Sequence, residues 1–190
     1  MPLALDPLET AGVATGVLGV WLTVRQNLWC WPVSLANVSL YAVVFFRARL
    51  YADVGLQAVF FLLCTVGWWR WLHPGPLSKE LKVTRLASRE AAALGAASLI
   101  GALGMGHFFA THTDAALPYW DSTTVAISLV AQWLLTRKIL ENWQLWIVAD
   151  VMMVGIYLAK GLTPTAGLYA LYTLLAVQGL RQWRRSMLVA

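Results

Sequence analysis

The sequence predicts an all-α integral membrane protein with seven transmembrane helices, built as two parallel three-helix repeats that are joined by a linker helix. Three observations lead to this prediction. Hydrophobic residues make up 59% of the 190 residues and charged residues only 12%, about half the charged content of a typical soluble domain. The chain contains seven apolar segments of membrane-spanning length. Its last part also repeats features of its first part at a constant spacing.

The seven apolar segments come close to the roughly 20 residues that a helix needs to cross the hydrocarbon core of a bilayer. We expect helices over residues 8–24, 28–46, 54–72, 91–110, 120–136, 143–159 and 166–183. The longest connection, 73–90, is polar and basic. Pro74, Gly75 and Pro76 at its start end the third helix cleanly. This connection is therefore the predicted boundary between the first repeat and the linker helix.

Basic residues predict how the chain is oriented in the membrane. If seven helices alternate in direction, only Arg47, Arg49 and Lys160 of the 14 Lys and Arg residues fall on the side of the N-terminus. The other eleven fall on the side of the C-terminus. Loops rich in Lys and Arg stay in the cytoplasm. We therefore expect the N-terminus outside and the C-terminus inside the cell.

An internal repeat is visible when the chain is shifted by 112 positions. Residues of the same type then coincide: Trp21 with Trp133, Arg25 with Arg137, Gly67 with Gly179 and Trp71 with Trp183. Between these anchors we expect the alignment to drift by three or four positions, which pairs Asn27 with Asn142, Trp31 with Trp146 and Tyr41 with Tyr157. Since each repeat has an odd number of helices, one further helix must restore the orientation of the second repeat. The predicted parts are 1–72, the first repeat; 73–112, the basic loop and linker helix; and 113–190, the second repeat.

Two stretches carry a recognisable set of motifs. Residues 138–146 read K-I-L-E-N-W-Q-L-W, and Gly155-Ile156-Tyr157 and Lys160-Gly161-Leu162 follow; the first repeat contains Trp31-Pro32, Leu50-Tyr51-Ala52-Asp53 and Gly67-Trp68-Trp69. These strings resemble the nicotinamide riboside transporter family of the PnuC type. The resemblance implies a facilitator in the bacterial inner membrane that takes up nicotinamide riboside, with thiamine or riboflavin as alternative substrates. It also implies a homotrimer and a cytoplasmic kinase that retains the substrate by phosphorylating it.

Asp150 is the strongest candidate for a substrate contact. It lies near the middle of the sixth predicted helix, where an ionisable side chain costs about 2.5–3.5 kcal/mol on insertion scales. Nicotinamide riboside carries a pyridinium cation and thiamine a thiazolium cation, either of which a carboxylate in a low-dielectric site would attract. Riboflavin is neutral and would use Asp150 only as a hydrogen-bond acceptor. A structural hydrogen bond between helices is the alternative interpretation, and both stay open.

The remaining candidates are polar or aromatic side chains within the predicted helices. Asn37 and Tyr41 share one face of the second helix and offer the donors and acceptors that a ribose or an amide needs. The other candidates for substrate binding are Gln57, Ser128, Gln132, Asn142, Trp143, Trp146 and Tyr157. We expect Trp143 or Trp146 to stack on the ligand or to close an inner gate. For Asn37 and Tyr41 the alternative is hydrogen bonding between helices, which contributes around 0.6 kcal/mol in membranes. For Trp143, Trp146 and Tyr157 the alternative is anchoring at the membrane interface.

Several functional classes find no support in the sequence. It has no G-x-x-x-x-G-K-[ST] loop for ATP, no H-E-x-x-H or G-x-S-x-G motif, no metal-ligand spacing and no basic module for nucleic acid. We expect no cofactor. A small integral membrane enzyme or sensor subunit is the alternative from another class, but an enzyme would need a second titratable group beside Asp150. We therefore expect facilitated diffusion by alternating access, with the site at the midplane between the repeats. Proton coupling through Asp150 stays open as an alternative.

Overall fold

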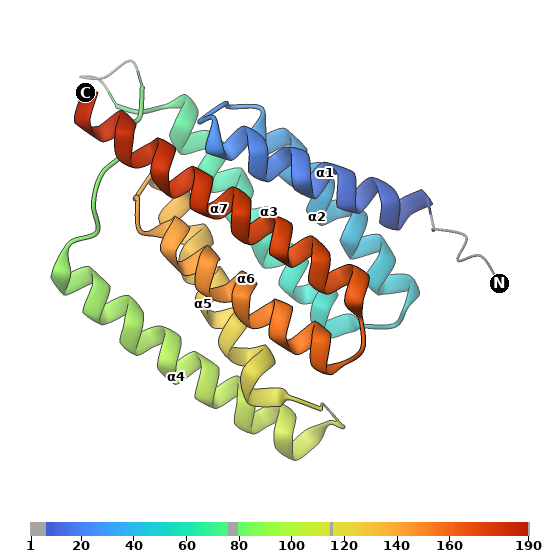
Figure 1. Ribbon diagram of the computed structural model, residues 1–190. Helices are drawn as coiled ribbons and strands as arrows, with labels where there is room; N and C mark the ends of the chain where they lie inside the picture. The colour runs from blue at the N-terminus through green and yellow to red at the C-terminus, as the bar shows by residue number, and fades with distance from the viewer. Residues whose placement is uncertain (1–6, 76–79, 115, 190) are drawn as a thin grey trace. The chain divides into compact units, whose positions relative to one another are not determined.

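The computed structural model describes residues 7–75, 80–114 and 116–189, and its ordered elements are α-helices (Figure 1). In chain order they are α1 (Pro7–Val24), α2 (Cys30–Arg47), α3 (Tyr51–Leu72), α4 (Ser88–His112), α5 (Pro118–Thr136), α6 (Asn142–Ala159) and α7 (Thr163–Val189). The predicted all-α fold with seven helices is thereby confirmed. Every helix boundary lies within three residues of its predicted place except the end of α7.

The last helix continues to Val189, well beyond its predicted end at Trp183. The prediction followed the apolar segment, which does end near Trp183. The helix itself continues because the residues that follow contain no Gly or Pro that would stop it. Ser186 also supports this turn, since its hydroxyl donates to the carbonyl of Trp183 at 2.8 Å.

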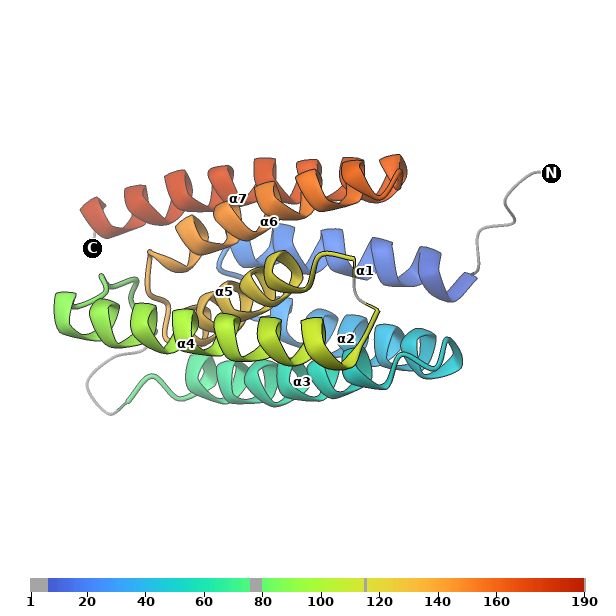
Figure 2. The same ribbon diagram turned by 90° about the horizontal axis from the view of Figure 1, so that it is seen from below.

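The helices form two compact units, Met1–Leu81 and Lys82–Ala190. In the first unit, α2 packs against both α1 and α3. In the second unit, α5 packs against α4 and α6, and α6 packs against α7. Figure 2 shows α6 and α7 lying side by side, and Figure 1 shows α4 running along α5. The predicted linker helix is therefore part of the second compact unit.

Five helical segments are long and apolar enough to cross a membrane, judged over the described residues: Pro7–Val24, Cys30–Arg47, Ala52–Leu72, Ser88–His112 and Asn142–Ala159. The α5 and α7 helices are long enough but more polar. Part of the polarity of α5 is buried inside the second unit, as at Ser122, Thr124, Gln132 and Thr136. Helices satisfy their backbone hydrogen bonds internally, which is what a bilayer demands of a spanning segment. The chain is a multi-pass membrane protein.

The two units repeat the same backbone at a shift of 112 positions. At this shift Cys30–Arg47 coincides with Asn142–Ala159, helix for helix. The left-handed residues also coincide: Gln26 (φ 55°) with Lys138 (φ 53°), and Arg49 (φ 60°) with Gly161 (φ 72°). Such backbone angles are uncommon outside glycine, so their recurrence at equivalent turns is a specific structural match.

Each unit also contains a glycine covered by a tryptophan ring that meets a second tryptophan. In the first unit Trp31 lies on Gly67 and meets Trp71 edge-on, with ring centroids 5.3 Å apart. In the second unit Trp143 lies on Gly179 and meets Trp183 edge-on at 5.4 Å. Trp31 is therefore equivalent to Trp143, and its predicted pairing with Trp146 is wrong. The alignment of the two units keeps a shift of 112 here, because in each unit the tryptophan ring lies opposite the glycine.

Candidate functional site between α6 and α7

A buried carboxylate and an aromatic cluster come together where α6 packs against α7. Asp150 of α6 has a relative exposure of 6%. Tyr157 follows it by two helical turns on the same face. The turn between the helices is short, and Gly161 in its left-handed conformation (φ 72°) allows the chain to reverse there. This reversal places α7 along the face of α6 that carries Tyr157.

Three tyrosines make up the aromatic part of this site, which we call the tyrosine cluster (Tyr157, Tyr169 and Tyr172). Tyr157 and Tyr169 are stacked, with ring centroids 5.3 Å apart and an interplanar angle of 21°. Their side chains also share a hydrogen bond. Tyr172 meets Tyr169 edge-on at 5.8 Å. Asp150 interacts electrostatically with Tyr169, so we consider the cluster and the carboxylate together as one candidate site.

This arrangement offers the chemistry that a flat, positively charged ring requires. Aromatic faces attract cations and stack on planar rings. A carboxylate in a low-dielectric site attracts a cation strongly. The tyrosine hydroxyls can both donate and accept hydrogen bonds to a sugar. The site therefore suits an aromatic cation that carries hydroxyl groups, with no covalent chemistry required of the protein.

The first turn of α6 carries three further candidates, and the structure distinguishes between them. Asn142 is fully buried and its side-chain amide donates to the carbonyl of Ile139 at 2.6 Å. Trp143, at 2% exposure, is packed against Gly179 and Trp183. This packing favours the structural interpretation of Trp143. The half-buried Trp146 is the better candidate of the two tryptophans for stacking on a ligand.

Two candidates on α5 lie one helical turn apart. Gln132 is buried, with 7% exposure, and Ser128 is half-buried. Their helix packs against α6, whereas the tyrosine cluster belongs to the contact of α6 with α7. The α5 helix that carries them thus packs against the same helix, α6, as α7 does.

Asn37 and Tyr41, two of the candidates in the first unit, connect α2 to α1. The side-chain amide of Asn37 donates to the carbonyl of Gly12 at 2.6 Å and to the hydroxyl of Thr15 at 3.1 Å. The ring of Tyr41 covers Gly12, where a Cβ would lie 3.1 Å from it. These hydrogen bonds favour one of the two interpretations that the sequence left open, in which Asn37 joins two helices.

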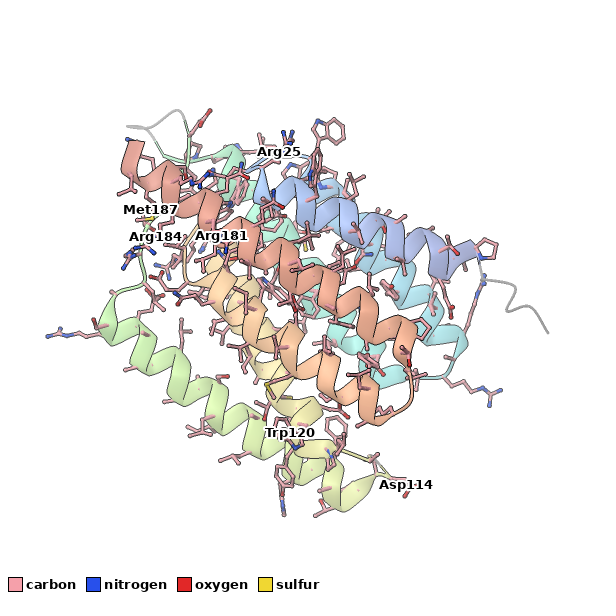
Figure 3. The ribbon with its side chains drawn as sticks, viewed as in Figure 1. Arg25, Asp114, Trp120, Arg181, Arg184 and Met187 are labelled. Atoms are coloured by element: carbon pink, nitrogen blue, oxygen red, sulfur yellow. The ribbon has the colours of Figure 1, made fainter. Side chains whose placement is uncertain are left out.

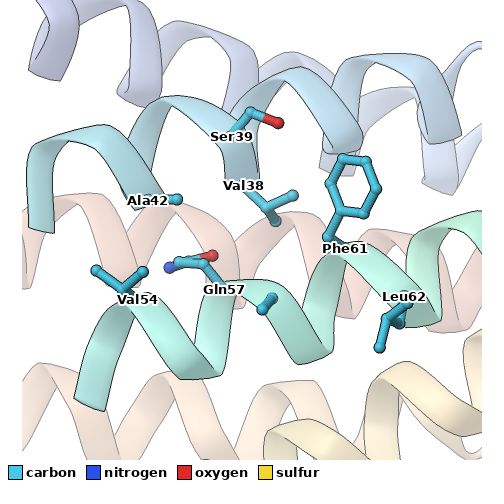
Figure 4. Close-up of a pocket in the computed structure, with 8 residues that line it drawn as sticks. Val38, Ser39, Ala42, Val54, Gln57, Phe61 and Leu62 are labelled. Carbon is cyan, nitrogen blue, oxygen red and sulfur yellow. The ribbon is translucent and has the colours of Figure 1, made fainter. Parts of the chain in front are cut away.

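Gln57 lines a groove between α2 and α3 (Figure 4). The groove has a volume of about 350 Å³ and an apolar lining apart from two polar side chains. Its lining residues are Val38, Ser39, Ala42, Val54, Gln57, Ala58, Phe61 and Leu62. The amide of Gln57 is therefore placed where a ligand entering this groove from outside could reach it.

The structure thus places Asp150 and Tyr157 on one face of α6 and adds Tyr169, which the set of predicted contacts lacked. A signal for it was present, because Tyr169 and Tyr172 are three positions apart and so share a helical face. The stacking of Tyr169 on Tyr157 could not be predicted from the sequence, since it depends on how α7 packs against α6. Across 7–75, 80–114 and 116–189, no group of three His, Cys, Asp or Glu side chains could hold a metal ion.

Comparisons with known proteins show which family this chain resembles. The sequence model described as nicotinamide mononucleotide transporter matches residues 6–185. The nicotinamide riboside transporter PnuC of Escherichia coli (strain K12) is 29% identical over 96% of this chain and 87% of its own length. The riboflavin/roseoflavin transporter RibM of Streptomyces davaonensis is 26% identical over 92% of this chain and 83% of its own. A crystal structure of the vitamin B3 transporter PnuC matches with a TM-score of 0.75 and 27% identity, covering 94% of this chain and 80% of the other.

Proposed function

Because this chain belongs to the nicotinamide mononucleotide transporter family, we propose that it carries nicotinamide riboside across the bacterial inner membrane. The observation that supports this substrate best is the buried Asp150 beside the tyrosine cluster. Nicotinamide riboside combines a flat pyridinium cation with a ribose. The stacked rings suit the flat cation, the carboxylate suits its charge, and the hydroxyls suit the ribose.

The transport mechanism that we propose is facilitated diffusion by alternating access. The sequence contains no ATP-binding loop. In this proposal the concentration gradient of the substrate supplies the driving force. A cytoplasmic kinase that phosphorylates the riboside would maintain this gradient. The protein itself leaves its substrate chemically unchanged, and we propose that it works as a homotrimer. Light scattering of the purified protein tests the trimer, and recovery of unmodified riboside from liposomes tests the absence of chemistry.

The charge of the substrate is the property that tests the site most directly. Nicotinamide riboside and its uncharged 1,4-dihydro form have nearly the same shape, so they differ mainly at the ring that Asp150 is proposed to face. We expect the unmodified protein to bind the cation at least about tenfold more tightly, a difference of about 1.4 kcal/mol. Asp150→Asn should lose most of this discrimination. Titration calorimetry with the purified protein measures both affinities.

Matched variants separate a substrate contact from a fold defect. Asp114 is an exposed acid in the loop before α5, so Asp114→Asn should leave the discrimination unchanged. Tyr157→Phe keeps the stacked ring and should bind the riboside within about threefold of the unmodified protein, whereas Tyr157→Leu should bind it much more weakly. If Asp150→Asn discriminates between the two compounds as well as the unmodified protein does, Asp150 is not the partner of the cation.

Riboflavin is the second candidate substrate, because one relative is a riboflavin/roseoflavin transporter. Its ring system is neutral, so its binding should not depend on the charge of Asp150. Uptake of labelled riboflavin that survives Asp150→Asn, without uptake of nicotinamide riboside, would favour this alternative. Thiamine, a cation, should instead follow the behaviour of nicotinamide riboside in the same variants.

The proposed orientation places the N-terminus outside and the C-terminus in the cytoplasm. In the second unit, Arg181 and Arg184 lie at one end and Asp114 and Trp120 at the opposite end (Figure 3). This separation of charge supports a cytoplasmic position for the arginine end. Cysteine labelling tests it, since the native Cys30 and Cys64 are buried. A membrane-impermeant reagent added to intact cells should modify Asp114→Cys but not Leu188→Cys.

A further inference from the structure

A short segment just before α4 lies along the turn between α5 and α6. We call residues 82–87 the strap. Thr84 forms a parallel β-bridge with Ile139. The amide of Thr84 donates to the carbonyl of Lys138 at 3.1 Å, and the amide of Leu140 donates to the carbonyl of Thr84 at 2.9 Å. The strap and the turn are therefore joined through their backbones.

Two carboxylates add side-chain contacts to this backbone bridge. Glu141 accepts a hydrogen bond from the amide of Leu86 at 2.9 Å. Glu90, in the first turn of α4, forms an ion pair with Arg137 at the end of α5. Both side chains of this ion pair are about one-third exposed, so water only partly screens it. The acids thus connect the strap and the start of α4 to the residues that lead into α6.

The equivalent turn of the first unit has the same backbone but, among the described residues, no strap. Asn27, Leu28 and Trp29 stand there in place of Ile139, Leu140 and Glu141 at the shift of 112. Leu28 and Trp29 are 40% and 68% exposed, whereas Ile139 and Leu140 are each 2% exposed.

Trp29, moreover, cannot accept a hydrogen bond as Glu141 does. Its backbone amide instead donates to the side-chain oxygen of Asn27 at 2.9 Å, so this hydrogen bond stays within the turn. Among the residues that the structure describes, the two units therefore differ in that only the second has a covered turn.

We propose that Glu141, Arg137 and Glu90 are positioning residues, which hold the strap on the α5–α6 turn and thereby fix the start of α6. The α6 helix carries Asp150, so its position decides where the carboxylate meets the substrate. During transport the strapped turn stays closed. The part of this inference that concerns transport rests on the proposed function.

A covalent lock tests whether the strap must open. Thr84 and Ile139 are bridge partners, and neighbouring strands are about 4.7–4.9 Å apart, which a disulfide can span. We would introduce Thr84→Cys and Ile139→Cys into a background with Cys30→Ala and Cys64→Ala. Purified protein in liposomes is then assayed for riboside uptake before and after oxidation. We expect rates within twofold, and uptake that stops on oxidation and returns on reduction would overturn the proposal.

Loosening the strap tests the positioning role. Arg137→Gln should lower the maximal uptake rate at least threefold, because the start of α6, and with it Asp150, is held less firmly in place. The charge-swapped pair, Glu90→Arg with Arg137→Glu, should recover at least half of the rate. Lys160→Gln is the matched control, because it removes a similarly exposed ion pair between the other ends of α5 and α6. It should leave the rate unchanged.

Hydrogen exchange gives a readout that does not depend on transport. In Arg137→Gln the amides of Leu86 and Leu140 should exchange at least tenfold faster, while those in the middle of α6 keep their protection. Exchange that accelerates throughout the second unit, or a charge swap that restores nothing, would overturn the positioning role. The unmodified protein could fail to take up nicotinamide riboside while Arg137→Gln still shows the expected exchange pattern. The proposed substrate would then be refuted, and the positioning role of the strap would be retained.

Discussion

A methyl group added at Gly179 should destabilise the second unit, because the ring of Trp143 already occupies that space. A Cβ at this position would lie 2.6 Å from two atoms of the ring. The ring cannot move aside easily, since Trp143 is 2% exposed and rests edge-on against the fully buried Trp183. Overpacking of a well-packed core costs about 1–3 kcal/mol. The gain in helix propensity from Gly to Ala offsets only about 0.5–1 kcal/mol.

We therefore expect Gly179→Ala to lower the free energy of unfolding by about 1–2 kcal/mol, which for a chain of this size is a fall in Tm of roughly 2–8 °C. Near-UV circular dichroism of the purified protein in detergent follows the tryptophan packing during heating. Gly167→Ala, also in α7 but with nothing within 4 Å of the added Cβ, should leave Tm unchanged or raise it. Adding Trp143→Phe to Gly179→Ala should restore part of the loss. Equal Tm values for the two alanine variants would refute the packing argument.

Two further predictions use the same thermal measurement. Asn37→Ala removes the hydrogen bonds to Gly12 and Thr15, so it should lower stability by about 0.6–1 kcal/mol with little change in KM; a raised KM at unchanged Tm would instead indicate a substrate contact. Lys160→Gln breaks a pair with Asp121 at 3.3 Å in which both side chains are at least one-third exposed, so stability should change by less than about 1 kcal/mol. Any such change should shrink in high salt, and a larger loss that salt does not alter would contradict this assignment.

Much of the fold could be predicted because a bilayer imposes simple rules on a chain. Apolar length sets the helices, and Gly and Pro at 74–76 set the longest connection. The recurrence of Gly67 and Trp71 as Gly179 and Trp183 indicated the repeat. The middle of the alignment was wrong because chance matches between abundant tryptophans, such as Trp31 with Trp146, outweighed the true partner. The packing of each ring on its glycine, together with the helix bounds, identifies Trp143 as that partner.

The candidate site was only partly predictable. Asp150 stood out because an acid in the middle of an apolar segment is costly wherever the helix packs. Tyr157 was among the candidates, but its stacking on Tyr169 depends on the contact between α6 and α7. Trp143 was predicted as a ligand contact, and its position against Gly179 supports a packing role. The type and position of each residue in the sequence indicate which side chains could bind a substrate. Packing against neighbouring helices determines which of these side chains remain free to contact it.

The sequence alone thus determined the class of protein, the helices and the carboxylate, since each follows from the free energy of placing a residue type in a membrane. Tertiary structure decided the rest. The tyrosine cluster, the register of the repeat and the strap all join residues that are distant in the chain, such as Leu86 with Glu141. Such pairings depend on the geometry of packed helices, and the pattern of hydropathy along one helix carries no information about the side chains of its neighbour.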